Sequence, residues 1–185
     1  SGGNYNVAIG DEAGTALTTG DNNIAIGYAA LDAANTALNN VAIGLNALGS
    51  ITTAGKTIGI GTNTGGSMVT GAGENVLIGH NVASAGTTLQ QTIAIGDNAI
   101  GSGIATGANN VLIGDNAGLV LTSGVNNVGV GGHSLNANTT GGNNTAIGKG
   151  AATLVTTGGP NVMVGTLAGQ TLTTGTFNIY IGYNV

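Results

Sequence analysis

The chain has no cysteine, no arginine and no tryptophan, and only one proline among its 185 residues. Without cysteine, a disulfide framework or a cysteine–zinc site is excluded. Two lysines against seven acidic residues give a net charge of −5. This is too little positive charge for a surface that neutralises nucleic-acid phosphates. No run of 18 apolar residues occurs, so no membrane-spanning helix is predicted.

Glycine is abundant instead, with 37 residues, or one in five. It does not fall at every third position and proline is scarce, so a collagen triple helix is excluded. Apolar residues make up 41% of the chain and charged residues 5%. This composition also argues against disorder caused by low hydrophobicity and high charge. The chain is apolar enough to pack, but it has too few large side chains for a thick core.

A five-residue motif recurs eleven times along the chain. The first copy is Asn-Val-Ala-Ile-Gly at residues 6–10, and later copies include NIAIG, NVLIG and NTAIG. Successive closing glycines are 17 residues apart, with two gaps of 18. Such a period indicates a repeat architecture. The closing glycines are Gly10, Gly27, Gly44, Gly61, Gly79, Gly96, Gly114, Gly131, Gly148, Gly165 and Gly182.

We number each repeat from its closing glycine as position zero. Positions −3 and −1 carry Val or Ile in nearly every copy, and alternate residues of a strand share one face. Both columns are therefore predicted to point into the core, together with the small residues at +3 and the apolar residues at +7. The predicted core ladder at position −1 is Ile9, Ile26, Ile43, Ile60, Ile78, Ile95, Ile113, Val130, Ile147, Val164 and Ile181.

A unit of 17 residues is too short for a helical repeat but fits one coil of a parallel β-solenoid. We predict an all-β fold of about eleven coils, forming a single domain over residues 1–185. Each coil would have two short strands, N-V-A-I and roughly A-L-T-T, separated by corners that hold the closing glycine and stacked asparagines. Neither end shows a capping repeat, which we interpret as part of a longer fibre or as ends covered by other segments or subunits.

Position −2 lies between the two predicted core columns and is therefore predicted to point outward. It is apolar and mostly small, and a long apolar stripe on a surface usually marks an interface. We predict lateral self-association, most simply as three rods about one axis. The alternative is that these residues are individually tolerated on the surface. The predicted interface is Ala8, Ala25, Ala42, Leu77, Ala94, Leu112, Ala146 and Met163.

The repeats over 18–31 (TTGDNNIAIGYAAL) and 138–151 (NTTGGNNTAIGKGA) resemble the NTAIG-type repeats of phage and prophage tail fibres. They are also similar to the head repeats of trimeric autotransporter adhesins, whose repeat is usually shorter. The resemblance covers the whole chain. It implies a left-handed β-roll and a homotrimer that displays a surface for attachment to cells, glycans or matrix.

Residues able to perform catalysis are few and scattered. His80 and His133 belong to coils three apart, roughly 14 Å along the rod, which is too far for shared ligation. Asp97 and Asp115 fall on adjacent coils and could approach within about 5 Å. They are predicted to be solvated corner acids, and the alternatives are a bound cation or a paired-carboxylate hydrolase. No nucleotide-binding, hydrolase or zinc-protease motif occurs. We predict no enzyme activity, no metal and no cofactor.

Position +8 carries a column of threonines that is predicted to point outward. A flat, regular Thr array could order water, so an ice-binding solenoid is the alternative function. The structural interpretation is that Thr favours strands and forms ladders with itself. The candidate surface-binding residues are Thr18, Thr52, Thr87, Thr122, Thr139, Thr156 and Thr173.

Taken together, the repeat and the composition predict a structural or adhesive fibre segment, either a tail-fibre shaft or an adhesin head. It is expected outside the cell, at a cell surface or on a virion. Its partners are further copies of itself and a receptor on a cell or in the matrix, without nucleic-acid binding or membrane insertion.

Overall fold

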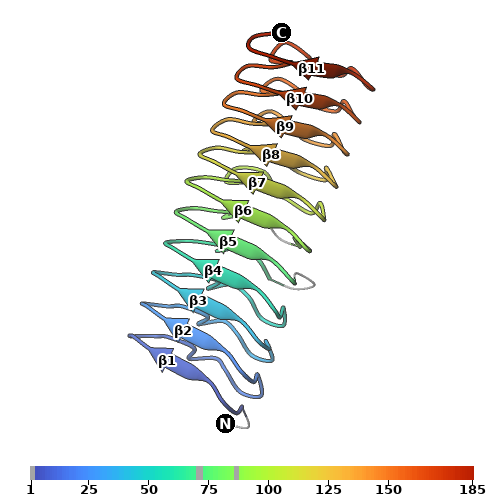
Figure 1. The fold of residues 1–185 in the computed structure, drawn as a ribbon. Helices are drawn as coiled ribbons and strands as arrows, with labels where there is room; N and C mark the ends of the chain where they lie inside the picture. Colours follow the sequence, from blue (N-terminus) through green and yellow to red (C-terminus); the bar gives the residue numbers. More distant parts are fainter. Residues whose placement is uncertain (1–2, 70–72, 86–87) are drawn as a thin grey trace.

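The computed structural model of the chain describes residues 3–69, 73–85 and 88–185. The chain winds into a rod of stacked coils with the two termini at opposite ends (Figure 1). In the described residues each repeat contributes one three-residue strand, and these form one parallel sheet in sequence order. The predicted all-β solenoid is therefore confirmed. The strands are β1 (Val7–Ile9), β2 (Ile24–Ile26), β3 (Val41–Ile43), β4 (Ile58–Ile60), β5 (Val76–Ile78), β6 (Ile93–Ile95), β7 (Val111–Ile113), β8 (Val128–Val130), β9 (Thr145–Ile147), β10 (Val162–Val164) and β11 (Ile179–Ile181).

Every strand pairs with the next in the register that the repeat dictates. In β3 and β4, for example, Val41 lies beside Ile58, Ala42 beside Gly59 and Ile43 beside Ile60. Each column of the sequence repeat thus becomes a continuous row along the rod. The two gaps of 18 residues leave this register unchanged, since β4–β5 and β6–β7 also pair column by column.

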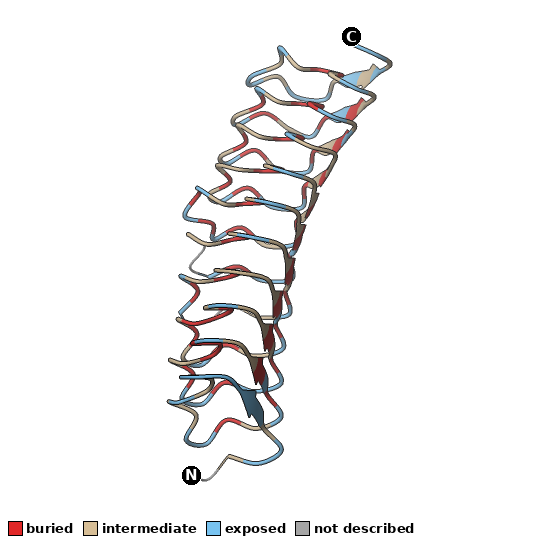
Figure 2. Ribbon diagram, turned by 90° about the vertical axis from the view of Figure 1, so that its left-hand side faces the viewer, coloured by how far each residue is buried: buried red, intermediate tan, exposed pale blue. Residues whose placement is uncertain are grey.

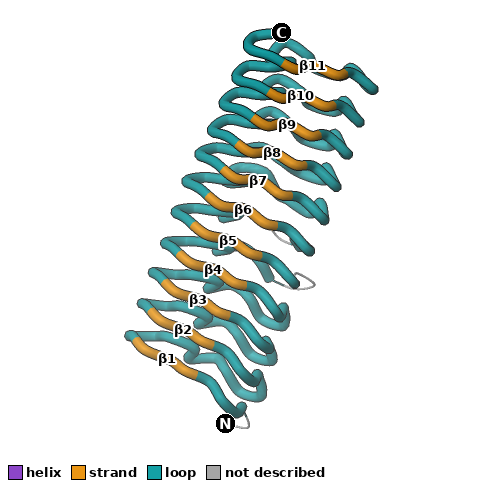
Figure 3. Tube along the Cα trace, viewed as in Figure 1, coloured by secondary structure: helices purple, strands orange, loops and turns teal. Residues whose placement is uncertain are grey.

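The second predicted strand, roughly A-L-T-T, is not a strand in the described residues, which form turns and bends there (Figure 3). The backbone N–H groups of Thr122, Ser123 and Gly124 all donate to the carbonyl oxygen of Thr139, at 2.9–3.1 Å. Three donors that converge on one acceptor cannot alternate in direction, as a ladder of two strands requires. The prediction of two strands per coil was wrong, and this side of the coil is a stacked corner.

The predicted inside and outside of the strand were reversed. The middle residue of each strand from β2 to β10 is buried, whereas the residues on either side of it are exposed or half-buried (Figure 2). The predicted core ladder therefore lies on the outer surface: Ile9, Ile26, Ile43, Ile60, Ile78, Ile95, Ile113, Val130, Ile147, Val164 and Ile181. The predicted interface residues that are instead completely buried are Ala25, Ala42, Leu77, Ala94, Leu112, Ala146 and Met163. Ala8 is exposed in the first coil.

The physical reason is that the coil is narrow. Alternation places positions −3 and −1 on one face and −2 on the other, but a period of two does not say which face is inside. The inward side chain of the sheet must fit against the segment that follows the closing glycine. The large inward residue Leu112 fits because Gly118 lies opposite, where an added Cβ would come within 2.6 Å of a Leu112 methyl carbon. Conversely, Gly59 leaves room for Leu48.

A row of buried asparagines borders the sheet at position −4. Asn40 donates through Nδ2 to Asn23 Oδ1 at 3.1 Å and to the Ala54 carbonyl at 3.0 Å, and its backbone N–H donates to the same Asn23 oxygen at 3.0 Å. The same three bonds recur at Asn144 with Asn127 and Gly158. Buried amides are stable only when their hydrogen bonds are satisfied, and this row satisfies them from coil to coil. The predicted asparagine stacking is confirmed.

The closing glycines form the corners, as predicted. All eleven have φ between 128° and 140°, a region that residues with a side chain rarely adopt. The first ten of them also lie against the closing glycine of the next coil. A Cβ added at Gly44 would be 2.5 Å from the Gly61 carbonyl oxygen. Glycine is therefore required both by the dihedral angle and by the spacing of the coils.

One buried side chain breaks the pattern of the core. Position +7 is apolar and buried in the coils of Ile51, Leu121 and Val155, but the corresponding Asn138 is also fully buried and neither of its side-chain polar atoms has a partner. Leaving such atoms unpaired costs about 1–3 kcal/mol. Leucine has the same number and branching of side-chain heavy atoms as asparagine but no polar atom. We therefore expect Asn138→Leu to raise the free energy of unfolding by about 1–2 kcal/mol in guanidinium titrations. Leu121→Asn, which creates the same defect one coil away, should lower it, and equal stability of all three proteins would contradict the explanation.

Candidate functional site

The exposed side of the sheet is the most extensive unusual surface of the rod. It consists of the outward residues of all eleven strands, and we call it the outer Ile/Val face. It carries no charged residue, and Thr145 is its only polar one. Its members are Val7, Ile9, Ile24, Ile26, Val41, Ile43, Ile58, Ile60, Val76, Ile78, Ile93, Ile95, Val111, Ile113, Val128, Val130, Thr145, Ile147, Val162, Val164, Ile179 and Ile181.

The repeat makes this face long and regular. Strands in one sheet are about 4.8 Å apart and alternate residues about 7 Å apart, so the face is about 50 Å long and roughly 10 Å wide. Its area of about 500 Å² matches the largest apolar patches found on ordinary monomers. Ile147 is 42% exposed and Ile93 37% exposed, so substantial apolar surface is in contact with water. Covering this face is the strongest physical driving force that the molecule offers.

The threonine column lies on another side of the rod. Thr122 Oγ1 donates to the Thr139 carbonyl at 2.9 Å, and Thr139 Oγ1 donates to the Thr156 carbonyl at 3.2 Å. The hydroxyls of Thr18, Thr52 and Thr156 donate to the next coil in the same way. These bonds fasten one coil to the next, as the structural interpretation predicts. Thr87 lies outside the described residues, and Thr173 is exposed.

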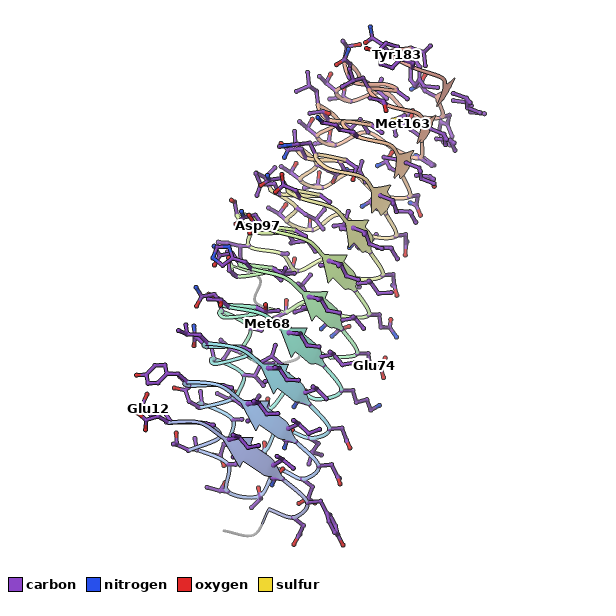
Figure 4. The ribbon with its side chains drawn as sticks, turned by 60° about the vertical axis from the view of Figure 1, so that its left-hand side comes forward. Glu12, Met68, Glu74, Asp97, Met163 and Tyr183 are labelled. Carbon is purple, nitrogen blue, oxygen red and sulfur yellow. The ribbon has the colours of Figure 1, made fainter. Side chains whose placement is uncertain are left out.

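The histidines and aspartates line the edge of the sheet where the strands end, and Figure 4 labels Glu12 and Asp97 on this edge. His80 Nδ1 lies 2.8 Å from Asp97 Oδ1, and His133 Nε2 lies 3.8 Å from Asp115 Oδ2. Each aspartate thus has its own histidine partner. Among the residues that the structure describes, no group of three such side chains converges as a metal site would require. All four side chains are about half exposed, so these pairs contribute little to stability.

Tyr28 lies on the same edge of the rod, next to the acidic residues of the first coil. A hydrogen bond to the Glu12 carboxylate, and the negative charge of that carboxylate, raise the pKa of Tyr28. The phenol therefore remains neutral at physiological pH. A phenol whose pKa is raised is a weaker nucleophile at neutral pH than an unperturbed one.

The opposite edge, where the strands begin, carries a second polar cluster. Lys56 Nζ lies 3.1 Å from Glu74 Oε1, and Gln91 Nε2 donates to Glu74 Oε2 at 3.0 Å. The three residues hold the same position in three consecutive coils. The Gln91 hydrogen bond and then the Lys56 ammonium lower the pKa of Glu74, so its carboxylate is ionised at neutral pH. No sequence motif indicates this cluster because its members are 17–18 residues apart, although they share one column of the repeat.

The described residues contain no helix long and apolar enough to cross a membrane. Comparison with family models, with curated proteins and with solved structures found no match to the chain.

Proposed function

We propose that the chain is a non-enzymatic fibre segment that associates side by side with further copies of itself and displays its remaining surface for attachment. The observation that carries the proposal is the uncharged outer Ile/Val face, which spans every strand of the rod. The resemblance to tail-fibre and adhesin repeats supports a homotrimer outside the cell or on a virion. The interface differs from the alanine stripe predicted from the sequence, because that stripe lies in the core.

A second copy is the occupant that fits this face best. A partner must cover an apolar strip about 50 Å long without charged contacts, and its own side chains must repeat about every 4.8 Å to interlock with the rows. Another copy of the rod has this spacing along its whole length. With the flanking corner residues, the buried area approaches the roughly 800 Å² per partner that is typical of stable interfaces. Three rods facing one axis would remove all of these rows from water.

The double variant Ile60→Lys/Ile113→Lys tests the interface. Both side chains point outward from the middle of the rod, so the fold tolerates lysine there, whereas association would bury several like charges without partners. Light scattering after gel filtration should give the parent a multiple of the 17.6 kDa chain mass, threefold for a trimer, and give the variant 17.6 kDa.

A matched control places two lysines on exposed apolar residues elsewhere. Val69 and Leu154 are 42% and 48% exposed and lie away from the outer Ile/Val face and its flanking corners, so Val69→Lys/Leu154→Lys should keep the parent mass. A parent protein that is monomeric at 17.6 kDa, or a face variant that retains the parent mass, would overturn the proposal.

A further inference from the structure

A groove lies along the edge of the rod where strands β3 to β6 begin. Its volume is about 420 Å³, within the usual range for small-molecule sites. Lys56, Glu74 and Gln91 form one wall, Leu38 contributes an apolar patch, and Gly55 and Gly73 line the groove between them. Figure 4 shows Glu74 projecting from this edge, away from the edge that carries Asp97.

The groove coincides with a local departure from the repeat. The wall residues occupy position −5, which is asparagine in five of the other coils. The backbone there is left-handed in all of them, with φ of 58° at Lys56, 60° at Glu74 and 49° at Gln91. Asparagine tolerates this conformation, whereas long side chains adopt it at a cost of about 1 kcal/mol each. Three consecutive coils therefore carry long polar side chains at a position where the repeat imposes a left-handed backbone and asparagine is the commonest residue.

The backbone in the groove is held in place. Gly55 pairs with Gly73 in a parallel bridge, and Gly73 pairs with Gln90, so the coils are joined at this position as well as in the sheet. Neither glycine has a side chain to cover the groove. A Cβ at Gly55 would lie 2.7 Å from the Leu38 carbonyl oxygen, so the coils approach closely here. The polar wall thus stands on a rigid support, which a binding site requires.

The chemistry of the wall favours a neutral ligand with adjacent hydroxyls. The ammonium of Lys56 and the carboxylate of Glu74 lie 3.1 Å apart, so a strong donor and a strong acceptor stand side by side with no net charge. A hydroxyl both donates and accepts, so two hydroxyls on neighbouring ring carbons can accept from Lys56 and donate to Glu74 at once. Because the charges of the pair cancel, neither an anion nor a cation gains a net attraction from it. Leu38, which is 44% exposed, can contact the C–H face of a sugar ring.

We propose that this groove binds one unit of a neutral saccharide through a pair of adjacent hydroxyl groups. The inference deepens the proposed function, because it states what the displayed surface of the fibre recognises. It rests on the proposed attachment role and not on the proposed self-association. The groove is formed within one chain, so binding does not require association.

Saturation-transfer NMR with the full chain tests the site. The probes are the methyl glycosides of glucose, galactose, mannose and N-acetylglucosamine at millimolar concentration, with the methyl glycoside of sialic acid as an anionic comparison. At least one neutral glycoside should bind more tightly than the anionic one. Glu74→Gln and Lys56→Gln should each weaken that binding about tenfold, because each removes a charge-assisted hydrogen bond.

Lys149→Gln is the matched control. It removes the only other lysine, which belongs to the +1 column at the edge where the strands end, and it should leave binding unchanged. Absence of binding for all four neutral glycosides would overturn the proposal, as would tighter binding of the anionic one or binding that is insensitive to Glu74→Gln. None of these results would alter the mass measured by light scattering. The saccharide proposal and the self-association proposal are therefore tested independently.

Discussion

Ala94→Asp is expected to unfold the middle of the rod, whereas Ile93→Asp, one residue earlier in β6, is expected to leave it folded. Ala94 is completely buried between the sheet and the opposite wall of the coil, and a carboxylate there would have no partner. Leaving a charge unpaired in a core costs about 3–5 kcal/mol, a large part of the stability of an ordinary domain. Ile93 points outward and is 37% exposed, so a charge at that position remains in water.

Guanidinium unfolding followed by circular dichroism would separate the two variants. Ala94→Asp should show a lower midpoint or an early first transition, because each coil depends on its neighbours for burial. Ile93→Asp should stay within about 1 kcal/mol of the parent, apart from any stability supplied by association. If the two aspartates had equal effects, or if Ile93→Asp were the more damaging, the inward direction of the alanine column would be wrong.

The second large effect is expected at the corner glycines. Gly44→Ala should lower the free energy of unfolding by about 3 kcal/mol or more, because a φ of 131° is open almost only to glycine. The new Cβ would also meet the Gly61 carbonyl oxygen at 2.5 Å, and both atoms belong to paired coils that cannot separate freely.

Gly132→Ala provides the comparison at a glycine just after a corner. The nearest atom to a Cβ there is the Asp115 carbonyl oxygen at 3.8 Å, an ordinary contact distance, and its φ is not in the left-handed region. Thermal unfolding should therefore place Gly132→Ala close to the parent and Gly44→Ala well below it. Similar melting temperatures for the two variants would show that the closing glycines are not required for stacking.

The fold class could be predicted from the sequence because this fold depends on the regular spacing of the repeat. An exact spacing of the motif aligns identical columns, and identical columns in parallel strands give the register that pairs Ala42 with Gly59. The corner glycines and the asparagine row followed from the same alignment. Neither conclusion required knowing which side of the strand was inside.

Alternation alone does not show which face of each strand is buried. The preference of β-branched residues for buried positions predicted the wrong face. A usable signal was nevertheless present in the volumes of two columns. Leu112 and Met163 at position −2 coincide with Gly118 and Gly169 six residues later. In four of the seven coils where position −2 is Ala or Gly, the residue six positions later is Leu or Ile, as in the pair Ala25 and Leu31. Columns that exchange volume must share one cavity, so this compensation places position −2 inside.

The apolar surface was predicted in part, whereas the polar groove was not predicted. Self-association was inferred from an apolar stripe, and the structure provides such a stripe, but it consists of Ile and Val rather than alanine. The polar groove was not predicted because Lys56 and Glu74 are remote in sequence. Only the stacking of coils brings Lys56 Nζ to 3.1 Å from Glu74 Oε1. Chemistry that is divided among repeats becomes visible only when the repeats are aligned in columns.

The direction of the inter-coil hydrogen bonds has a mechanical consequence. The strands run across the rod, so bonds such as that from Ile24 N to Asn40 O point along its length, and tension applied to the two ends loads successive coils in series. A pulling force is therefore resisted by the weakest layer rather than shared among all layers. When one coil opens, 17 residues that occupied about 5 Å of the axis can extend to about 58 Å. Under load, a single chain of this design would lengthen in steps and dissipate energy at each one, while bundling with other copies would let neighbouring rods hold an opened layer in place.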